Sequence, residues 1–177
     1  MDAPLRTDGV IALGGYDSEL RAAVLRMKRP QDDSLSASIG RLLVGRRLEL
    51  LASAEADLVV PVPMYWTRRI GRGTNSPEII AQSVSVGLKV AMRRRALVRC
   101  RNTLPQADLS PRQRFHNVKG AFRMRKRLDL DGARVLLVDD ILTTGATCSE
   151  AARALKEAGA ETVLAAVVAR AGVQGAG

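Results

Sequence analysis

Residues 134–169 constrain the fold of this chain more than any other stretch. An apolar run at residues 134–138 is followed by a polar loop, by a helical stretch at residues 147–158 that stops before Gly159, and by a second apolar run at residues 162–169. Two parallel strands of one sheet need a crossover of this length, which is usually a helix. A strand that is almost wholly apolar is typical of a parallel sheet covered on both faces. The pattern therefore predicts a β-α-β unit within an α/β fold.

The N-terminal third of the chain is predicted to be mainly helical. Leucine, valine and methionine recur at helical spacing in residues 16–29, where Asp17 or Ser18 can cap the helix, and leucine and isoleucine do so in residues 35–51. A short β-branched run at residues 57–62 then predicts a buried strand that ends in prolines.

Further along the chain, Ser76 is predicted to be the N-cap of a helix, because a proline and an acidic residue follow it. Residues 96–99 are predicted to form another strand. Residues 102–119 are polar, contain proline and show no clear periodicity, so they are predicted to form a long loop, which in a compact domain often has a function.

The length of 177 residues suits one domain with a substantial core. We expect residues 1–56 to form an N-terminal helical segment and residues 57–177 to form the main α/β domain, with both parts packed as one compact unit.

The chain is strongly basic, with a formal net charge of +10 carried mostly by arginine. Arginine presents a planar fork of donors that suits phosphate and carboxylate oxygens. The excess of arginine therefore favours a polyanionic ligand, either a phosphorylated small molecule or nucleic acid, although a general preference for arginine over lysine would produce the same composition.

Cysteine and histidine are too few for a metal knuckle. The chain has Cys100, Cys148 and a single histidine, His116, and the two cysteines are far apart in sequence. We therefore expect no metal bound by protein cysteines and no disulfide framework. No apolar run is long enough to cross a membrane, and residues 1–9 lack the apolar core of a secretory signal. We expect a cytoplasmic protein without membrane insertion.

The residues after the strand at 134–138 carry groups for chemistry. Asp139 and Asp140 come first, and their carboxylates can accept hydrogen bonds from a vicinal diol, such as two hydroxyls of a ribose. The turn that follows offers hydroxyls, a flexible glycine and the N–H groups of a helix start, which together favour a phosphate. The predicted phosphate-binding residues are Thr143, Thr144, Gly145, Ala146 and Thr147.

Other interpretations of this loop fit less well. A P-loop requires a lysine before its last hydroxyl residue, and a dinucleotide fingerprint requires three spaced glycines; this loop has neither. An acidic pair of the response-regulator type would lie near the start of a βα chain, whereas Asp139 lies near the end of this one. The alternative without a ligand is that a threonine caps the helix and that the acidic pair before it has no role in binding.

The stretch Val135–Thr147 resembles the phosphoribosyl-pyrophosphate signature of type I phosphoribosyltransferases. Other segments are similar to the ComF family of that superfamily, which is associated with competence and DNA uptake. They are Tyr16–Lys28, Val60–Pro63, Arg72–Asn75, Thr103–Gln106, Leu109, Arg114, Asn117–Val118 and Gly120–Phe122. The resemblance covers almost the whole chain after Gly15. The cysteine-rich zinc module that begins many family members is not present in the sequence.

The resemblance implies a type I phosphoribosyltransferase fold, with a central, mostly parallel sheet flanked by helices and a small N-terminal helical cover. It also implies a flexible hood loop at residues 102–119 that closes over the site. Asp139 and Asp140 would be the catalytic pair that holds the ribose. Pro61, Val62, Pro63 and Arg72 would lie on the pyrophosphate side, and Gln106 and Arg114 would reach the ligand from the hood.

The function implied by the resemblance is binding of phosphoribosyl pyrophosphate and transfer of its phosphoribosyl group to an unknown nucleophilic acceptor, with Mg²⁺ bound mainly through the ligand. Such a protein would be a glycosyltransferase. The alternative is a non-catalytic accessory protein of competence and DNA uptake that responds to phosphoribosyl pyrophosphate. Direct binding of single-stranded DNA is a third reading, which the aromatic content of 3% disfavours. The acceptor, the role of His116 and the oligomeric state, including a homodimer, stay open.

Overall fold

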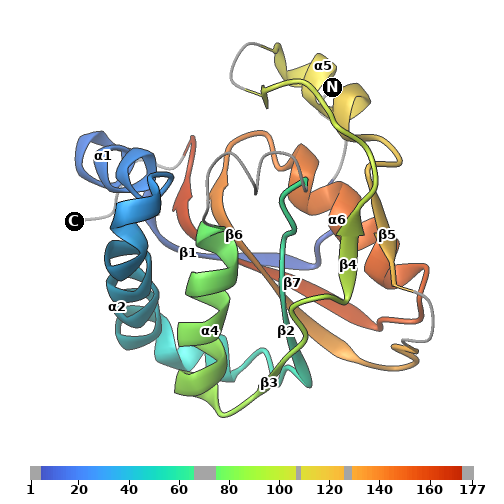
Figure 1. The fold of residues 1–177 in the computed structure, drawn as a ribbon. Coiled ribbons are helices and arrows are strands. Elements are labelled where there is room, and N and C mark those ends of the chain that lie inside the picture. Colours follow the sequence, from blue (N-terminus) through green and yellow to red (C-terminus); the bar gives the residue numbers. More distant parts are fainter. Residues whose placement is uncertain (1–4, 66–74, 107–108, 126–128, 173–177) are drawn as a thin grey trace.

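The centre of the molecule is a five-stranded parallel sheet (Figure 1). In a computed structural model of the chain, residues 5–65, 75–106, 109–125 and 129–172 are described. The strands, in their order across the sheet, are β1 (Gly9–Gly15), β7 (Thr162–Arg170), β6 (Arg134–Leu142), β2 (Leu58–Pro61) and β3 (Ala91–Met92). The α/β fold class and the parallel central sheet predicted from the sequence are confirmed.

Helices cover both faces of the sheet, which explains why its central strands are apolar throughout. One face carries α1 (Ser18–Arg26), the short 3₁₀ helix η1 (Pro30–Asp32), α2 (Asp33–Ala52) and α4 (Ser76–Leu88); the other carries α6 (Ala146–Lys156). Side chains of β6 alternate between the two layers, so that Val135 and Leu137 pack with α6, whereas Leu136 and Val138 pack with α2 and α4.

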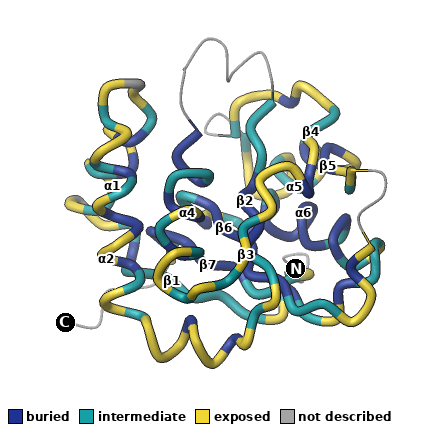
Figure 2. Tube along the Cα trace, turned by 60° about the horizontal axis from the view of Figure 1, so that its bottom comes forward, coloured by how far each residue is buried: buried dark blue, intermediate teal, exposed yellow. Residues whose placement is uncertain are grey.

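A small second sheet lies beside α6. It pairs β4 (Leu97–Arg99) with β5 (Phe122–Met124) in antiparallel fashion. The residues between these strands rise above the carboxyl edge of the main sheet and include the helix α5 (Pro111–Val118) (Figure 1). We call residues 102–119 the hood. Figure 2 shows that its tip is largely exposed, whereas the strands and α6 below it are buried.

Several local predictions are corrected by the structure. The N-terminal segment is not purely helical, because residues 9–15 form β1, which pairs with β7. Propensity did not predict this strand, because it is rich in glycine, which is uncommon in strands. The hood is not an irregular loop throughout, since Ser110 and Gln113 form a capping box that starts α5. Asp17, rather than Ser18, is the N-cap of α1.

Ser76 is not the N-cap of α4. Asn75 holds that position, and Ser76 is the first helical residue, whose hydroxyl donates a 2.6 Å hydrogen bond to the carbonyl of Met27. This bond ties the start of α4 to the end of α1 at the carboxyl edge of the sheet. The strand β6 is also longer than predicted: it continues through Asp139 and Asp140 to Leu142. Both acidic residues therefore lie on the strand itself.

Candidate functional site

A cavity of about 380 Å³ opens at the carboxyl edge of the sheet, between α1 and the hood. The edge is a common ligand site in open parallel sheets because strand ends and helix starts meet there. Its lining residues are Tyr16, Leu25, Lys28, Val62, Pro63, Met64, Asn75, Pro77, Arg99, Pro105, Gln106, Arg114 and all ten residues from Asp139 to Cys148. The acidic pair and the threonine-rich turn that were predicted from the sequence therefore line one cavity.

Asp139 is the buried member of the acidic pair, with 7% of its surface exposed. One carboxylate oxygen accepts the N–H of Asp140 at 2.9 Å, and the other accepts the thiol of Cys148 at 3.7 Å. Burial first, and the neighbouring charge of Asp140 second, raise the pKa of Asp139 well above its ordinary value. Burial, reinforced by the nearby Asp139, also raises the pKa of Cys148. Asp139 is therefore held by protein groups and is poorly placed to accept two ligand hydroxyls.

Asp140 is the member of the pair with room for a ligand. One of its oxygens lies 3.9 Å from the ammonium of Lys28, which is too far for a good hydrogen bond but close enough for electrostatic attraction. Its side chain is 15% exposed and lines the cavity. The carboxylate of Asp140 thus keeps acceptor capacity on the side that faces the cavity.

Replacing Asp139 by asparagine should stabilise the protein at neutral pH. Because the folded-state pKa of Asp139 lies above the unfolded value, its stabilising protonated form is lost as pH rises through the folded pKa. The Asp139→Asn variant removes that buried charge, and each kcal/mol gained would raise Tm by about 2–4 °C. Thermal melts at pH 8 and pH 5 should show a gain at pH 8 that shrinks at pH 5. The exposed Asp131→Asn is the control, and a lower Tm of the Asp139→Asn variant at pH 8 would contradict the assignment.

The phosphate turn, residues 143–147, leads from the end of β6 into the first residues of α6. Gly145 is the N-cap and has a left-handed backbone, with φ of +76°. The first N–H groups of a helix lack partners within it and point out of its positive end, so they favour an anion. The hydroxyls of Thr143 and Thr147 border the same cavity. The turn therefore has the local geometry expected of a phosphate cradle.

The hood contacts this turn directly. A guanidinium N–H of Arg114 donates to the hydroxyl of Thr143 at 3.1 Å, and the amide of Gln106 donates to the hydroxyl of Thr147 at 3.0 Å. The backbone carbonyl of Leu109 accepts a second N–H of Arg114 at 2.9 Å and holds the side chain in place. Both hood residues named from the sequence are thus brought within reach of any group bound at the phosphate turn.

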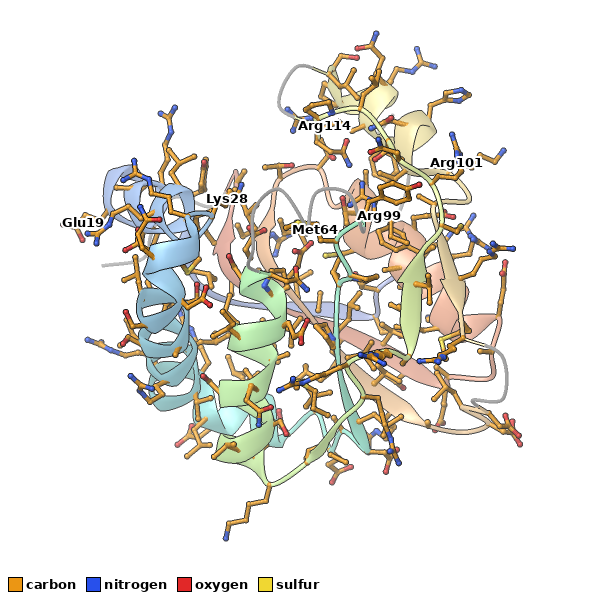
Figure 3. All side chains as sticks on the ribbon, in the orientation of Figure 1. Glu19, Lys28, Met64, Arg99, Arg101 and Arg114 are labelled. Carbon is orange, nitrogen blue, oxygen red and sulfur yellow. The ribbon has the colours of Figure 1, made fainter. Side chains whose placement is uncertain are left out.

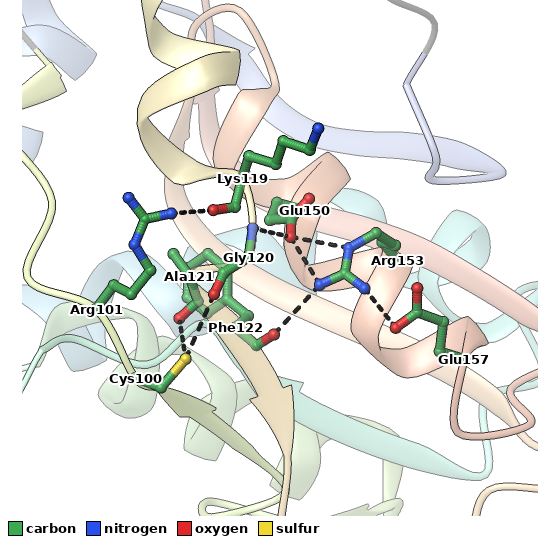
Figure 4. A network of polar contacts seen from close by, with 9 residues as sticks. All are labelled: Cys100, Arg101, Lys119, Gly120, Ala121, Phe122, Glu150, Arg153 and Glu157. Carbon is green, nitrogen blue, oxygen red and sulfur yellow. Dashed lines mark hydrogen bonds and ion pairs between the residues drawn. The ribbon is translucent and has the colours of Figure 1, made fainter.

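A buried carboxylate fastens the base of the hood to α6 (Figure 4). Glu150 accepts the N–H of Gly120 at 2.7 Å and a guanidinium N–H of Arg153 at 2.8 Å. Arg153 also donates to the carbonyl of Phe122 at 3.4 Å and pairs with Glu157. Glu150 lies one turn after Thr147, so the helix that forms the phosphate turn also positions the hood.

Replacing Glu150 by glutamine should loosen the hood. Hydrogen bonds to a charged group contribute about 1.5–3 kcal/mol, so the amide of Gly120 should exchange roughly 10–100 times faster with solvent. Hydrogen exchange across residues 109–121 measures this change. Glu157→Gln is a matched control, because Glu157 pairs with the same arginine but is 63% exposed and does not contact Gly120. Equal exchange in the two variants would contradict the assigned role of Glu150.

Of the residues predicted for the pyrophosphate side, some line the cavity and others do not. Val62 and Pro63 line the cavity, and the N–H of Val62 bonds to the carbonyl of Val138 at 2.8 Å. Pro61 is buried in β2 opposite Val138 and shapes the strand end without lining the cavity. Arg72 lies outside the described residues. His116 lines a separate cavity between α5 and α6.

Some cavity residues were missed in the sequence. Lys28 and Tyr16 come from the α1 region, Asn75 from the start of α4, and Arg99 from β4, where its guanidinium lies 5.3 Å from the ring centre of Phe122. Tyr16, Lys28 and Asn75 lie in segments that the family resemblance covers, but only the pairing of distant elements brings them and Arg99 to this edge. Among the described helices, none is both long and apolar enough to cross a membrane.

The chain was compared with known proteins. A family model described as the phosphoribosyl transferase domain matches residues 71–176. The DNA utilization protein YhgH of Salmonella typhi is 32% identical over 157 residues, which cover 87% of this chain and 68% of that protein. Competence protein F of Haemophilus influenzae is 30% identical over 162 residues, covering 88% and 70%. A ribose-phosphate pyrophosphokinase of Methanopyrus kandleri is 56% identical over a stretch of 41 residues, which is 23% of this chain and 14% of that protein.

The matched domain family agrees with the α/β fold and its central parallel sheet. The family model spans more than half of the chain, and two relatives named for competence or DNA utilization match most of it. The chain therefore belongs to the phosphoribosyl transferase domain family, with the type I phosphoribosyltransferase fold, and within it to the ComF branch that includes competence protein F.

Proposed function

We propose that the protein binds phosphoribosyl pyrophosphate and transfers its phosphoribosyl group to an acceptor. The observation that carries the proposal is the shared cavity in which the carboxylate of Asp140 lies beside a phosphate turn. A ribose with hydroxyls on C2 and C3 and a phosphate on the exocyclic C5 needs an acceptor carboxylate near a phosphate-binding turn, and here both kinds of group follow one another at the end of β6. The family match supports a ligand of this type.

Different residues of the chain would bind different groups of the ligand. The first N–H groups of α6 and the hydroxyls of Thr143 and Thr147 would hold the 5′-phosphate, with Arg114 close enough to add a charged hydrogen bond. Asp140 would accept the ribose hydroxyls. Asp139 would act as a positioning residue, because its carboxylate fixes the N–H of Asp140 and the thiol of Cys148.

The reaction would proceed by substitution at C1 of the ribose. The acceptor forms a bond to C1, the bond from C1 to the pyrophosphate oxygen breaks, and pyrophosphate leaves with the electron pair. Positive charge develops on the sugar during this step, and the negative charge of Asp140 would stabilise it. Closure of the hood would exclude water, which otherwise competes with the acceptor for C1.

The residues of this site suit a magnesium ion that is bound mainly through the ligand. Asp140 is the accessible carboxylate, and among the described residues no group of three or more potential metal ligands gathers at one place. Magnesium typically keeps several waters and uses one or two carboxylates together with phosphate oxygens. When bound, the ion would neutralise part of the negative charge of the pyrophosphate.

Calorimetry on the wild-type protein tests the binding step. Phosphoribosyl pyrophosphate with Mg²⁺ should bind more tightly than ribose 5-phosphate or pyrophosphate alone, because the cavity would hold both ends of the intact ligand. Absence of binding to the intact ligand would refute the proposal. Omission of Mg²⁺ should weaken binding, since the pyrophosphate charge is then less well neutralised.

A second candidate function comes from the relatives, whose names refer to DNA utilization and competence. In this alternative the protein binds the same ligand without turnover and serves as a responsive accessory of DNA uptake. Release of pyrophosphate distinguishes the two functions. Ligand binding without release, across a broad panel of bases and amines, would favour the accessory role.

A further inference from the structure

The cavity has a second wall, which lies across the sheet edge from the hood. It consists of Tyr16, Leu25, Lys28, Met64 and Asn75, and we call it the α1 wall. Figure 3 labels Lys28 on the α1 side of the opening, Arg114 and Arg99 on the hood side, and Met64 between Lys28 and Arg99. Among the described residues, the hydrogen bonds from the phosphate turn reach the hood and none reaches the α1 wall. Within the described part of the chain, the α1 wall is not tied to the phosphate turn and can serve a ligand group other than the 5′-phosphate.

Lys28 is the cation of this wall. Arg99 and Arg114, the other described cations that line the cavity, both belong to the hood side and are engaged there, with Thr103 and Thr143 respectively. The ammonium of Lys28 has Asp140 as its neighbour at 3.9 Å, and the side chain is 35% exposed. It therefore has donors left to offer a ligand.

The remaining residues of the α1 wall are suited to a flat, mainly apolar body. Leu25 is 52% exposed although it is apolar, and Tyr16 is partly buried against the apolar cluster beneath α1. Met64 adds an adaptable apolar side chain. Aromatic and aliphatic side chains with a few polar groups are the usual lining of small-molecule sites.

Asn75 adds an unused acceptor to the same wall. Its side chain is 9% exposed, and its carbonyl oxygen is buried without a hydrogen-bond partner among the described residues. A buried polar atom without a partner costs free energy, which a donor group on a ligand can recover. A small shift of this side chain toward the cavity would present the oxygen to an N–H group.

The position of Lys28 restricts the charge of the ligand. In the proposed reaction positive charge develops at C1, next to Asp140, and an ammonium 3.9 Å from Asp140 opposes that charge. The opposition disappears when a negative group binds to Lys28. An anionic acceptor would both pair with Lys28 and remove the repulsion.

From these residues we infer that the α1 wall binds a planar, single-ring acceptor that carries a carboxylate, with the carboxylate on Lys28 and an N–H group directed to Asn75. This inference rests on the proposed function. A cavity of about 380 Å³ is at the small end for ligand sites, which favours a single-ring acceptor over a larger one. A ring nitrogen or amine of the acceptor would form the bond to C1, pyrophosphate would leave, and any surplus proton of the nitrogen would pass to solvent.

Matched acceptors that differ by one charge test the inference. The pairs are pyrazole-3-carboxylate with pyrazole, and 2-aminobenzoate with aniline, each titrated into protein saturated with phosphoribosyl pyrophosphate and Mg²⁺. Pyrophosphate release is followed in parallel. The carboxylate of each pair should bind at least about tenfold more tightly, because an ion pair in a partly dry cavity favours it. Equal affinity within the pairs, or no binding of either carboxylate, would overturn the inference.

Variants at position 28 assign the preference to Lys28. Lys28→Met should abolish the preference for the carboxylate, whereas Lys28→Arg should retain most of it. Arg21→Met removes an exposed cation from α1, the helix that ends just before Lys28, and should leave the preference as in wild type. Retention of the preference in Lys28→Met would overturn the inference.

The affinity for phosphoribosyl pyrophosphate distinguishes failure of this inference about the acceptor from failure of the proposed function. If Lys28→Met loses that affinity about as strongly as it loses the carboxylate, Lys28 serves the pyrophosphate, and the inference fails while the proposed function stands. If the wild-type protein itself does not bind phosphoribosyl pyrophosphate, the proposed function fails, and the inference fails with it. Thermal melts of all variants exclude unfolding as the cause of a loss.

Discussion

The Asp140→Asn variant is expected to bind phosphoribosyl pyrophosphate about a hundredfold more weakly than wild type. The variant keeps the shape of the side chain but removes its charge. Hydrogen bonds to a charged group contribute about 1.5–3 kcal/mol each, and two ribose hydroxyls would lose such a partner, which corresponds to a factor of about a hundred or more in affinity. Calorimetry with Mg²⁺ present measures the change directly.

If the protein is an enzyme, turnover should fall further than affinity. The carboxylate would act most strongly when positive charge has developed on the sugar, so its removal penalises the transition state more than the bound ligand. Asp131→Asn is the matched control, because it removes an exposed carboxylate of the same type outside the cavity. Unchanged affinity in the Asp140→Asn variant would remove the ribose-binding role from Asp140.

Replacing Gly145 by alanine is the second change for which we expect a large effect. Its backbone is left-handed, with φ of +76°, and a Cβ atom there would overlap a terminal methyl of Leu5. A residue with a side chain in this conformation costs about 1–2 kcal/mol. Leu5 can turn aside to relieve the contact, but the backbone strain stays within the phosphate turn and would distort it. Since its N–H groups bind the phosphate only in one geometry, affinity for phosphoribosyl pyrophosphate should fall at least about tenfold.

Two further variants separate backbone strain from steric contact. Gly132→Ala is the control for strain alone, because Gly132 has φ of +68° with open space around it and lies outside the cavity. It should lose stability without losing affinity for the ligand. Leu5→Ala combined with Gly145→Ala should recover the steric part of the stability loss and leave the backbone part. Full ligand affinity in Gly145→Ala would contradict the assignment of the turn as a phosphate cradle.

The sequence predicts those features of the site that are formed by residues adjacent in the chain. The strand at residues 134–138, the acidic pair and the threonine-rich turn follow one another directly along the chain. A strand that is buried on both faces must be apolar, and its end must deliver the next residues to the sheet edge, so their proximity does not depend on the rest of the fold. The same reasoning predicted the helix that begins after the turn.

The strand β1 and the start of α5 show where such reasoning is insufficient. β1 is rich in glycine, which local propensity assigns to turns, and only its pairing with β7 makes it a strand. The start of α5 depends on a capping box between Ser110 and Gln113, within a stretch whose polarity suggests a loop.

The tertiary structure alone decided which side chains share the cavity with the acidic pair. Arg114 reaches Thr143 across 29 residues of sequence, and Gln106 reaches Thr147 across 41. Lys28 meets Asp140 from the other end of the chain, and Asp139 is buried against Cys148 of α6 while its neighbour Asp140 is not. The sequence by itself determined the acidic strand end and the phosphate turn, because they are adjacent in the chain. The α1 wall, the hood contacts and the different roles of the two aspartates required the packing of distant elements, whose side-chain directions no local pattern encodes.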